Sequence, residues 1–307
     1  MDQKYSILLV DDEPEIRELI SDYLIEDEGY EVLTAEDGLH ALEILRNNRV
    51  DLVLSDINMP GMKGFDLLKE VKHLYPETKR VLITAYNVED YLDLALHHDI
   101  GNIFVKSTPF NFLELSTVLH NLLDGNIFGL DRYFSPDVQF SRFSVLRSNH
   151  LDQDAKKIIS VINDPDRVKR LELVLVELLT NAIFYGIRNE SPERKELWNH
   201  DFELTDDTAV EVTVASDCQK YAVSVKDKGG RLKKVDVLYW LHRQIAQDEN
   251  GMPLGLFDSH GRGLFIARRY IDRLVINIDR RKQTEVIIFN YHSNTFSGSK
   301  PLYINEI

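Results

Sequence analysis

The first part of the chain alternates between short apolar runs and longer stretches with helical periodicity. The apolar runs are rich in β-branched and aliphatic residues and predict five strands, at 6–10, 30–34, 50–55, 80–84 and 103–105. Elsewhere apolar residues recur every three or four positions and predict helices at 14–26, 37–46, 65–74, 88–98 and 110–123. Strict alternation of strands and helices predicts a parallel sheet covered on both faces, and so an α/β domain over residues 1–124.

Polar side chains follow four of these strands at the point where each strand ends. Asp11 and Asp12 follow the first strand, Asp56 follows the third, and the fourth and fifth lead to Thr84 and Lys106. Open α/β sheets bind ligands at this edge. With a flavodoxin-like strand order the first and third strands are neighbours, so three carboxylates would crowd together and repel one another. A hard cation such as Mg²⁺ relieves that repulsion, while Lys106 offers a compact positive charge and Thr84 a hydroxyl group to a phosphoryl group.

Residues 1–124 resemble the receiver domain of bacterial two-component response regulators. The resemblance rests on Asp11-Asp12, Asp56 with Met59-Pro60-Gly61 and Gly64, Thr84-Ala85, and Lys106. It implies that Asp56 is the phosphoacceptor and that a sensor histidine kinase is the partner. It also implies that Asp12 and Asp56 ligate Mg²⁺ with the backbone carbonyl of Asn58, that Asp11 assists, and that Thr84 and Lys106 contact the phosphoryl group.

Two positions depart from the receiver pattern. Ile103 stands three residues before Lys106, where an aromatic residue is usual, and two residues rather than none separate Lys106 from Pro109. The aromatic side chain that usually reports phosphorylation therefore has no counterpart at its usual position.

Glycines at 125 and 129 interrupt the helical pattern, and we interpret residues 125–150 as a linker. This stretch contains five aromatic side chains, which is too many for a flexible tether. We therefore expect it to pack against one or both domains.

The second half of the chain carries three polar or glycine-rich motifs in a fixed order. A helical pattern at 165–185 places Glu177 and Asn181 four positions apart, on one face. A hairpin pattern at 209–225 then leads to Asp227-Lys-Gly229, and Gly261-Arg262-Gly263 opens a further helix before two strands at 276–279 and 284–290. Taken singly, these motifs also suit a packing Asn, a turn, or a glycine helix start. Glycines that open a helix can, however, expose N–H groups to phosphate.

Together the three motifs resemble the α/β-sandwich ATPase domain shared by histidine kinases, gyrase-type proteins and anti-sigma-factor serine kinases. The match covers residues 151–292, with 293–307 as a tail, and the compact form of the motifs is most similar to the anti-sigma-factor kinases. The resemblance implies a bound ATP with Mg²⁺ on Asn181, the adenine amino group on Asp227 beside Gly229, and phosphates near Gly261, Arg262 and Gly263. Glu177 would take the proton from a target serine. The sequence departs from the pattern at Arg231, where a second glycine is usual, and at Tyr185, where a basic residue is common.

Composition narrows the binding partners, covalent links and cellular locations that we expect for this chain. The formal net charge is −15, and we find no basic stripe that would bind nucleic acid. Cys218 is the only cysteine, so the chain forms no internal disulfide. No apolar run is long enough to span a bilayer, and we expect a cytoplasmic protein.

Three functions fit these patterns to different degrees. The first is a receiver-controlled, ATP-dependent serine kinase that acts on an anti-sigma-antagonist-like or sigma-factor-like protein. The second is a phosphorylation-gated binding protein whose ATPase-like domain does not turn over ATP. A hybrid histidine kinase fits worst, because no helical hairpin with a phosphoacceptor histidine precedes the second domain, and His150 lies in the linker. Both resembled families often form dimers, so a homodimer is a further expectation.

Overall fold

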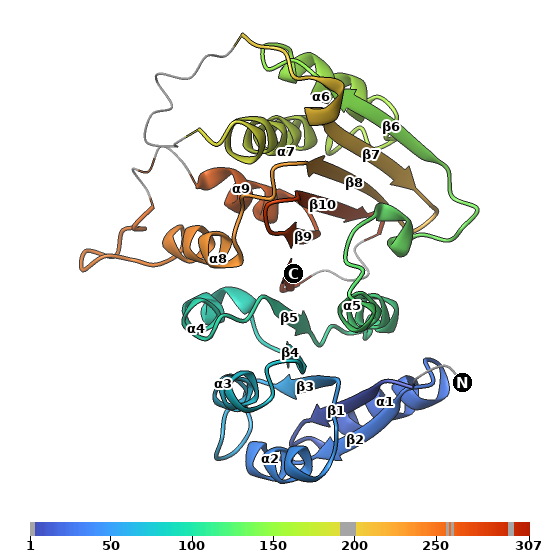
Figure 1. The fold of residues 1–307 in the computed structure, drawn as a ribbon, viewed down its shortest axis with the longest axis vertical. Coiled ribbons are helices and arrows are strands. Elements are labelled where there is room, and N and C mark those ends of the chain that lie inside the picture. Colours follow the sequence, from blue (N-terminus) through green and yellow to red (C-terminus); the bar gives the residue numbers. More distant parts are fainter. Residues whose placement is uncertain (1–3, 191–200, 256–257, 259–260, 294–297) are drawn as a thin grey trace. The chain divides into compact units, whose positions relative to one another are not determined.

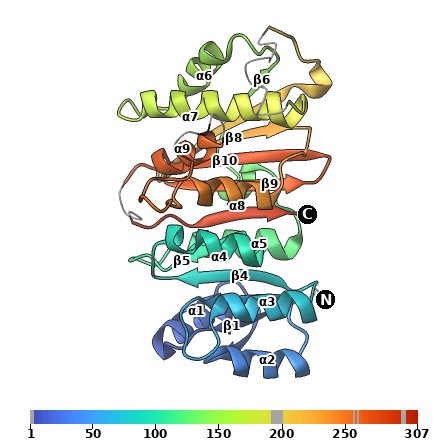
Figure 2. The same cartoon turned by 90° about the vertical axis from the view of Figure 1, so that its left-hand side faces the viewer.

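The computed structural model describes residues 4–190, 201–255, 258, 261–293 and 298–307, which belong to two compact units (Figures 1 and 2). The first unit comprises residues 1–127 and 298–303, and the second comprises 128–297 and 304–307. The chain therefore passes between the units three times, after residues 127, 297 and 303.

The first unit is built on a parallel sheet whose strands follow the order β2-β1-β3-β4-β5. The strands are β1 (Ser6–Val10), β2 (Glu31–Ala35), β3 (Leu52–Asp56), β4 (Lys79–Thr84) and β5 (Asn102–Val105). β1 and β3 are buried along their whole length, as expected for continuous apolar runs covered on both faces. Beyond β5, residues 302 and 303 of β11 (Leu302–Glu306) pair with it in antiparallel orientation.

Helices cover both faces of this first sheet. They are α1 (Pro14–Glu26), α2 (Gly38–Asn47), α3 (Gly64–Leu74), the short 3₁₀ helix η1 (Val88–Tyr91), α4 (Leu92–His98) and α5 (Phe112–Asp124). Figure 1 shows α1 and α5 on one face and α2, α3 and α4 on the other. Asp37 and Asn111 begin α2 and α5, and each accepts a hydrogen bond from a backbone N–H of the first turn. Caps of this kind stabilise a helix by about 1 kcal/mol. The flavodoxin-like fold expected for this region is confirmed.

The second unit contains an antiparallel sheet of order β6-β7-β8-β10-β9. Its strands are β6 (Phe140–Val145), β7 (Val210–Ser216), β8 (Lys220–Asp227), β9 (Arg273–Asp279) and β10 (Gln283–Tyr291). Residues 304–307 continue beyond β9, where the backbone N–H of Ile307 donates to the carbonyl of Ile278 at 2.9 Å.

The larger helices of the second unit lie on one face of its sheet (Figure 2). They are α6 (Leu151–Ile159), α7 (Val168–Thr180), α8 (Lys234–Arg243), α9 (Arg262–Tyr270) and the π-helix η3 (Asn181–Ile187), which continues α7. Two short 3₁₀ helices complete the unit: η2 (Leu130–Tyr133) and η5 (Asp206–Thr208). η2 packs on the other face, where the rings of Tyr133 and Phe289 are 4.9 Å apart. This helix-on-sheet arrangement is the α/β sandwich expected for the second domain.

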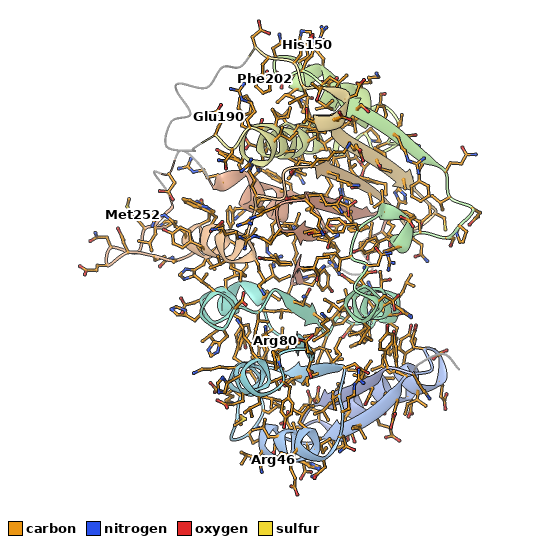
Figure 3. The ribbon with its side chains drawn as sticks, in the orientation of Figure 1. Arg46, Arg80, His150, Glu190, Phe202 and Met252 are labelled. Carbon is orange, nitrogen blue, oxygen red and sulfur yellow. The ribbon has the colours of Figure 1, made fainter. Side chains whose placement is uncertain are left out.

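The structure draws the domain boundaries differently from the sequence pattern. The stretch interpreted as a linker, 125–150, includes η2 and β6, which pair with or pack on the second sheet, and the stretch interpreted as a tail, 293–307, includes β11. The long predicted helix at 165–185 begins at Val168 and changes to π geometry at Asn181. Glu190 and Phe202 flank residues 191–200, which lie outside the described part of the chain together with 256–257, 259–260 and 294–297 (Figure 3). Among the described residues, no helix is both long and apolar enough to cross a membrane.

Candidate functional site

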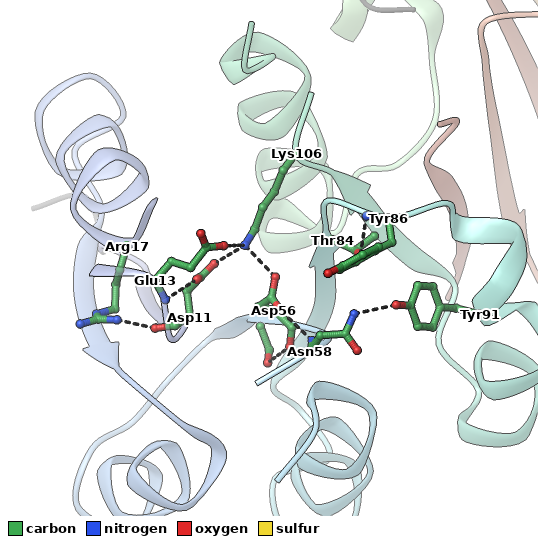
Figure 4. A network of polar contacts seen from close by, with 10 residues as sticks. Asp11, Glu13, Arg17, Asp56, Asn58, Thr84, Tyr86, Tyr91 and Lys106 are labelled. Carbon is green, nitrogen blue, oxygen red and sulfur yellow. Dashed lines mark hydrogen bonds and ion pairs between the residues drawn. The ribbon is translucent and has the colours of Figure 1, made fainter. Parts of the chain in front are cut away.

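A cluster of charged side chains lies at the carboxyl ends of β1, β3 and β5 (Figure 4). The ammonium nitrogen of Lys106 is 2.8 Å from Oδ2 of Asp11 and 2.7 Å from Oδ1 of Asp56. It is also 3.5 Å from Oε1 of Glu13. Asp11 and Asp56 are buried, and the side chain of Lys106 is 8% exposed. The parallel register thus brings together residues that are far apart in the sequence.

The charges of this cluster are not balanced. Burial raises the pKa of Asp11, and the hydrogen bond from Lys106 only partly opposes this effect. Burial would lower the pKa of Lys106, but its hydrogen bonds to Asp11 and Asp56 hold it above the ordinary value, so the ammonium stays charged at neutral pH. Three carboxylates share one ammonium, and this excess of negative oxygens suits a hard cation.

The cluster is not a closed metal cage. Asp12 is exposed, and within the described residues no group of three or more His, Cys, Asp or Glu side chains is placed to hold a metal ion. Mg²⁺ is commonly held by one or two carboxylates with several waters rather than by an all-protein cage. The residues present therefore fit Mg²⁺ in that open form, as carboxylate ligands supplemented by water.

Two neighbouring groups shape the surroundings of Asp56. The backbone N–H of Asn58 donates to Oδ2 of Asp56 at 2.6 Å, while the Asn58 side chain donates to the hydroxyl of Tyr91 at 2.6 Å (Figure 4). Thr84 is buried, and its hydroxyl oxygen accepts a hydrogen bond from the backbone N–H of Tyr86 at 3.0 Å. That acceptor role leaves the Thr84 proton available for another oxygen.

A cavity of about 450 Å³ opens in the second unit between the helices and the sheet. It collects every second-domain residue that the sequence singled out, except that Gly229 does not line it. The lining includes Glu177, Asn181, Asp227, Gly261, Arg262 and Gly263. Asn181 lies where the α-helix gives way to the π-helix, a local irregularity that is frequent at functional sites.

Glycines at this cavity allow polar side chains to approach closely. A β-carbon on Gly263 would lie 2.8 Å from Oε2 of Glu177 and 3.2 Å from Nδ2 of Asn181. Gly229 is required for a different reason, because a β-carbon there would overlap the carbonyl of Gly186. The glycine of the Asp227 motif therefore acts through packing beneath the cavity.

Two polar atoms on the cavity wall are suited to a ligand. Asp227 is buried, and its Oδ1 accepts hydrogen bonds from the N–H groups of Gly229 at 2.8 Å and Gly230 at 3.3 Å. Burial raises the pKa of Asp227 to about 6. Thr284 of β10 also lines the cavity, and its buried hydroxyl has no hydrogen-bond partner among the described residues. A buried hydroxyl without a partner is costly, and a bound ligand would satisfy it.

Helix α8 and the residues after it form one side of the cavity. Val237, Leu238 and Leu241 of α8 are buried in the core of the unit, whereas Val235 is exposed. Trp240 lines the cavity and packs against Gly261, where a β-carbon would overlap its ring. Further along, Arg243 and Asp258 form two hydrogen bonds, of 2.7 and 3.2 Å.

Comparison with known proteins gives two family matches. Residues 7–119 match the response regulator receiver domain, and residues 159–289 match the histidine kinase-like ATPase domain. The chain is 33% identical over 117 residues to sporulation initiation phosphotransferase F of Bacillus subtilis, covering 92% of that protein and 38% of this chain. The chain belongs to the response-regulator receiver family. Its second domain is a histidine-kinase-like ATPase domain.

Two further matches each cover a little more than a third of this response regulator. The transcriptional regulatory protein CpxR of Escherichia coli is 37% identical over 117 residues, and the match spans about half of that protein, 48%, and 38% of this chain. A solved structure of the response regulator TrrA of Thermotoga maritima, in complex with Mg²⁺ and BeF, is 40% identical. It covers 38% of this chain and 98% of its own, with a TM-score of 0.35.

Three residues of this response regulator were not identified from the sequence. Glu13 joins the Lys106 cluster, and its place directly after the two aspartates was a usable signal. Tyr91 comes from a helical turn after β4, and nothing in the sequence linked it to Asn58. Thr284 is a polar residue within an apolar strand pattern, which was a weak signal.

Proposed function

We propose that the receiver accepts a phosphoryl group on Asp56 from a sensor histidine kinase and thereby controls an ATP-binding output domain. The observation that carries this proposal is the buried Asp56 carboxylate held 2.7 Å from the Lys106 ammonium at the open edge of a parallel sheet. In the reaction, an Asp56 oxygen attacks phosphorus, the bond from phosphorus to the histidine nitrogen breaks, and the kinase histidine leaves. The Lys106 ammonium then balances part of the new phosphoryl charge, and the Thr84 hydroxyl donates a hydrogen bond to a phosphoryl oxygen.

Mg²⁺ belongs at the same edge. Asp12 and Asp56, with Asp11 and the backbone carbonyl of Asn58, are the groups that would hold it. The ion would supply positive charge to the phosphoryl oxygens during transfer. The excess of carboxylates over ammonium groups around Lys106 supports this assignment.

The cavity of the second domain is proposed to bind ATP. The Asp227 carboxylate would accept a hydrogen bond from the adenine amino group, and the Thr284 hydroxyl, which has no partner among the described residues, lies on the same wall. Asn181 would ligate Mg²⁺ at the phosphates, and the N–H groups from Gly261 to Gly263, with Arg262, hold the phosphate oxygens at the start of α9.

Transfer to a protein serine is the finer part of the proposal. Glu177 takes the serine proton, the serine oxygen attacks the γ-phosphorus, and ADP leaves with the electrons of the broken bond. The closeness of Glu177 and Asn181 to Gly263 supports this role, because base and phosphate site then lie together. The target would be an anti-sigma-antagonist-like protein.

A second candidate is a phosphorylation-gated binding protein that holds nucleotide without turnover. Arg231 and Tyr185 favour it, because both line the cavity at positions where the resembled kinases carry other residues. Burial raises the pKa of Tyr185 to about 12, so an uncharged hydroxyl occupies a place that is often basic.

Two measurements on the full chain test the proposal. With radiolabelled phosphoramidate and Mg²⁺, the wild type should form an acid-stable, base-labile aspartyl phosphate that Asp56→Asn lacks and that Asp66→Asn, an exposed control on α3, retains. Labelling that survives in Asp56→Asn would overturn the phosphoacceptor assignment.

Calorimetry with Mg·ATP tests the second domain. Wild type and Glu177→Gln should bind ATP, and Asn181→Ala should lose most of the affinity. With a serine-containing protein substrate, loss of transfer in Glu177→Gln supports the kinase. Binding without transfer in the wild type favours the second candidate.

A further inference from the structure

A buried carboxylate in the second unit joins three separate segments. Glu285 of β10 is 3% exposed and accepts a hydrogen bond from the hydroxyl of Ser224 on β8 at 2.6 Å. Its other oxygen accepts from the backbone N–H of Gly129 at 3.0 Å and from the side chain of Asn277 on β9 at 3.3 Å. A buried carboxylate needs such donors, so Glu285 fixes the positions of Ser224, Gly129 and Asn277 relative to one another.

This network reaches two of the points at which the chain enters the second unit, one through a bond to Glu285 and one through a bond to Asn277. Gly129 is the second residue after the crossing at 127, and its N–H is bound to Glu285 directly. Asn305 is the second residue after the crossing at 303, and its amide donates to Oδ1 of Asn277 at 2.8 Å. One carboxylate thus holds the first crossing directly and the third through Asn277.

Within the first unit, the same crossings are connected to α5 and β5, and β5 ends at the edge of the sheet that carries Asp56. Residue 127 follows α5, and residues 302 and 303 pair with Ile103 and Asn102 of β5. The next residue after β5 is Lys106, which contacts Asp56. A short stretch of main chain therefore joins Asn305 to the residues that pair with β5, the strand that leads to Lys106.

The other side of β10 and β8 forms the wall of the nucleotide cavity. Thr284 and Val286 flank Glu285 in sequence, and Val225 follows Ser224; all three line the cavity. Because successive side chains of a strand point to opposite faces, a displacement of Glu285 moves the cavity wall.

The network also has space to rearrange. A cavity of about 240 Å³ adjoins it, lined by residues that include Gly129, Asp131, Ser224 and Glu285. Oδ1 of Asn305 is buried and has no hydrogen-bond partner among the described residues. Residues 129–131 therefore have space to move, and Oδ1 of Asn305 could accept a hydrogen bond in a second conformation of the network.

We propose that Glu285 is the positioning residue through which the phosphorylation state of Asp56 sets the affinity of the second domain for ATP. The inference rests on the proposed function, because it requires both a phosphoryl group on Asp56 and a nucleotide in the cavity. Glu285 touches neither; it acts on Thr284 and Val286 from the opposite face of the sheet.

The test is the dissociation constant for Mg·ATP of the full chain, measured by calorimetry with and without beryllium fluoride as the phosphoryl mimic. In the wild type we expect the mimic to change the constant by about fivefold or more, the lower range of typical coupling. In Glu285→Ala the ratio should fall to about one, while ATP binding without the mimic stays within about threefold of wild type. Glu285→Gln should keep most of the ratio, because its amide oxygen still accepts from Gly129 and Asn277 and its NH₂ group can donate to Ser224.

Ser224→Ala is the matched control, because it removes the bond to β8 and leaves both crossings attached; it should keep the ratio. Asn305→Ala removes only the hydrogen bond that attaches the third crossing to Asn277, so it should reduce the ratio. This variant tests the proposal if Glu285→Ala does not fold. A Glu285→Ala protein that keeps the wild-type ratio overturns the proposal, as does a wild type that binds ATP with equal affinity in both states. A wild type that binds no ATP, while still forming the aspartyl phosphate, overturns the ATP assignment itself.

Discussion

The carboxyl group of Asp227 lies against Gly186, so closely that a β-carbon on Gly186 would come within 2.6 Å of the carboxyl carbon. Gly186 belongs to the π-helix that follows Asn181, and Asp227 ends β8. The contact therefore couples the backbone of the helical segment to the group proposed to bind adenine. Only glycine permits it without displacing one of the two.

Substitution of Gly186 by alanine should cost more free energy of ATP binding than free energy of unfolding. The new methyl group must push the Asp227 carboxyl group away from its bonds to Gly229 and Gly230. We expect the dissociation constant for Mg·ATP to rise by about tenfold, the equivalent of one lost hydrogen bond to a charged group. Calorimetry on Gly186→Ala measures this, with Lys228→Ala, the exposed neighbour of Asp227, as control. Unchanged affinity in Gly186→Ala would argue against Asp227 as the adenine ligand.

Replacing Asp227 by asparagine should stabilise the protein while it removes adenine binding. The unfolded carboxyl group has the ordinary pKa of 3.8, whereas burial raises the folded value to about 6. The folded state therefore binds the proton more tightly. That contribution to stability is present below about pH 4 and is lost as the pH rises through 6.

Asparagine avoids this loss, so Asp227→Asn should have a free energy of unfolding about 3 kcal/mol higher at pH 7.5. The advantage should shrink at pH 5. Urea unfolding followed by tryptophan fluorescence at both pH values checks this expectation. An equal advantage at pH 5 and 7.5 would point to a cause other than ionisation.

Adenine binding should weaken in acid. Only the ionised Asp227 carboxylate can accept at both oxygens, so affinity should fall about tenfold per pH unit below pH 6. Because nucleotide phosphates also titrate near pH 6, adenosine is the cleaner probe. Titrations at pH 7.5, 6 and 5 give the profile, and a flat profile would contradict the assignment of Asp227.

Replacing Lys106 by alanine should lower the free energy of unfolding, and Mg²⁺ should restore part of the loss. The buried carboxylates of Asp11 and Asp56 would lose their only close ammonium group among the described contacts, which by analogy with broken buried ion pairs costs about 3 kcal/mol. Added Mg²⁺ should raise the unfolding temperature of Lys106→Ala more than that of the wild type. Lys72→Ala is the control, since its pair with Asp99 is exposed and should contribute at most about 1 kcal/mol. If Mg²⁺ shifted both proteins equally, the carboxylates would not form its site.

The sequence could predict those parts of the fold in which periodicity is local and strong. The five receiver strands and their helices were predicted within a few residues, because each buries a regular apolar face. β6 was missed because Phe140 and Phe143 alternate imperfectly with polar residues at the edge of the sheet. β11 was missed because its partners lie far away in the sequence.

The residues of the candidate sites also differ in how far the sequence could identify them. Asp11, Asp56 and Lys106 were identifiable because each directly follows an apolar run, and the structure brings all three within ion-pair distance. Glu285 gave no signal: a glutamate in a strand suggests an exposed face, and only the donors supplied by other segments explain its burial.

The pairing of residues 302 and 303 with β5 has a consequence for biosynthesis. During translation the receiver emerges from the ribosome long before the segment that covers its β5 edge. Until that segment arrives, the edge offers unpaired backbone groups to any passing strand. An excised receiver that stops at residue 127 would keep this edge bare, and self-association of such a fragment would reflect the missing cover rather than a native dimer.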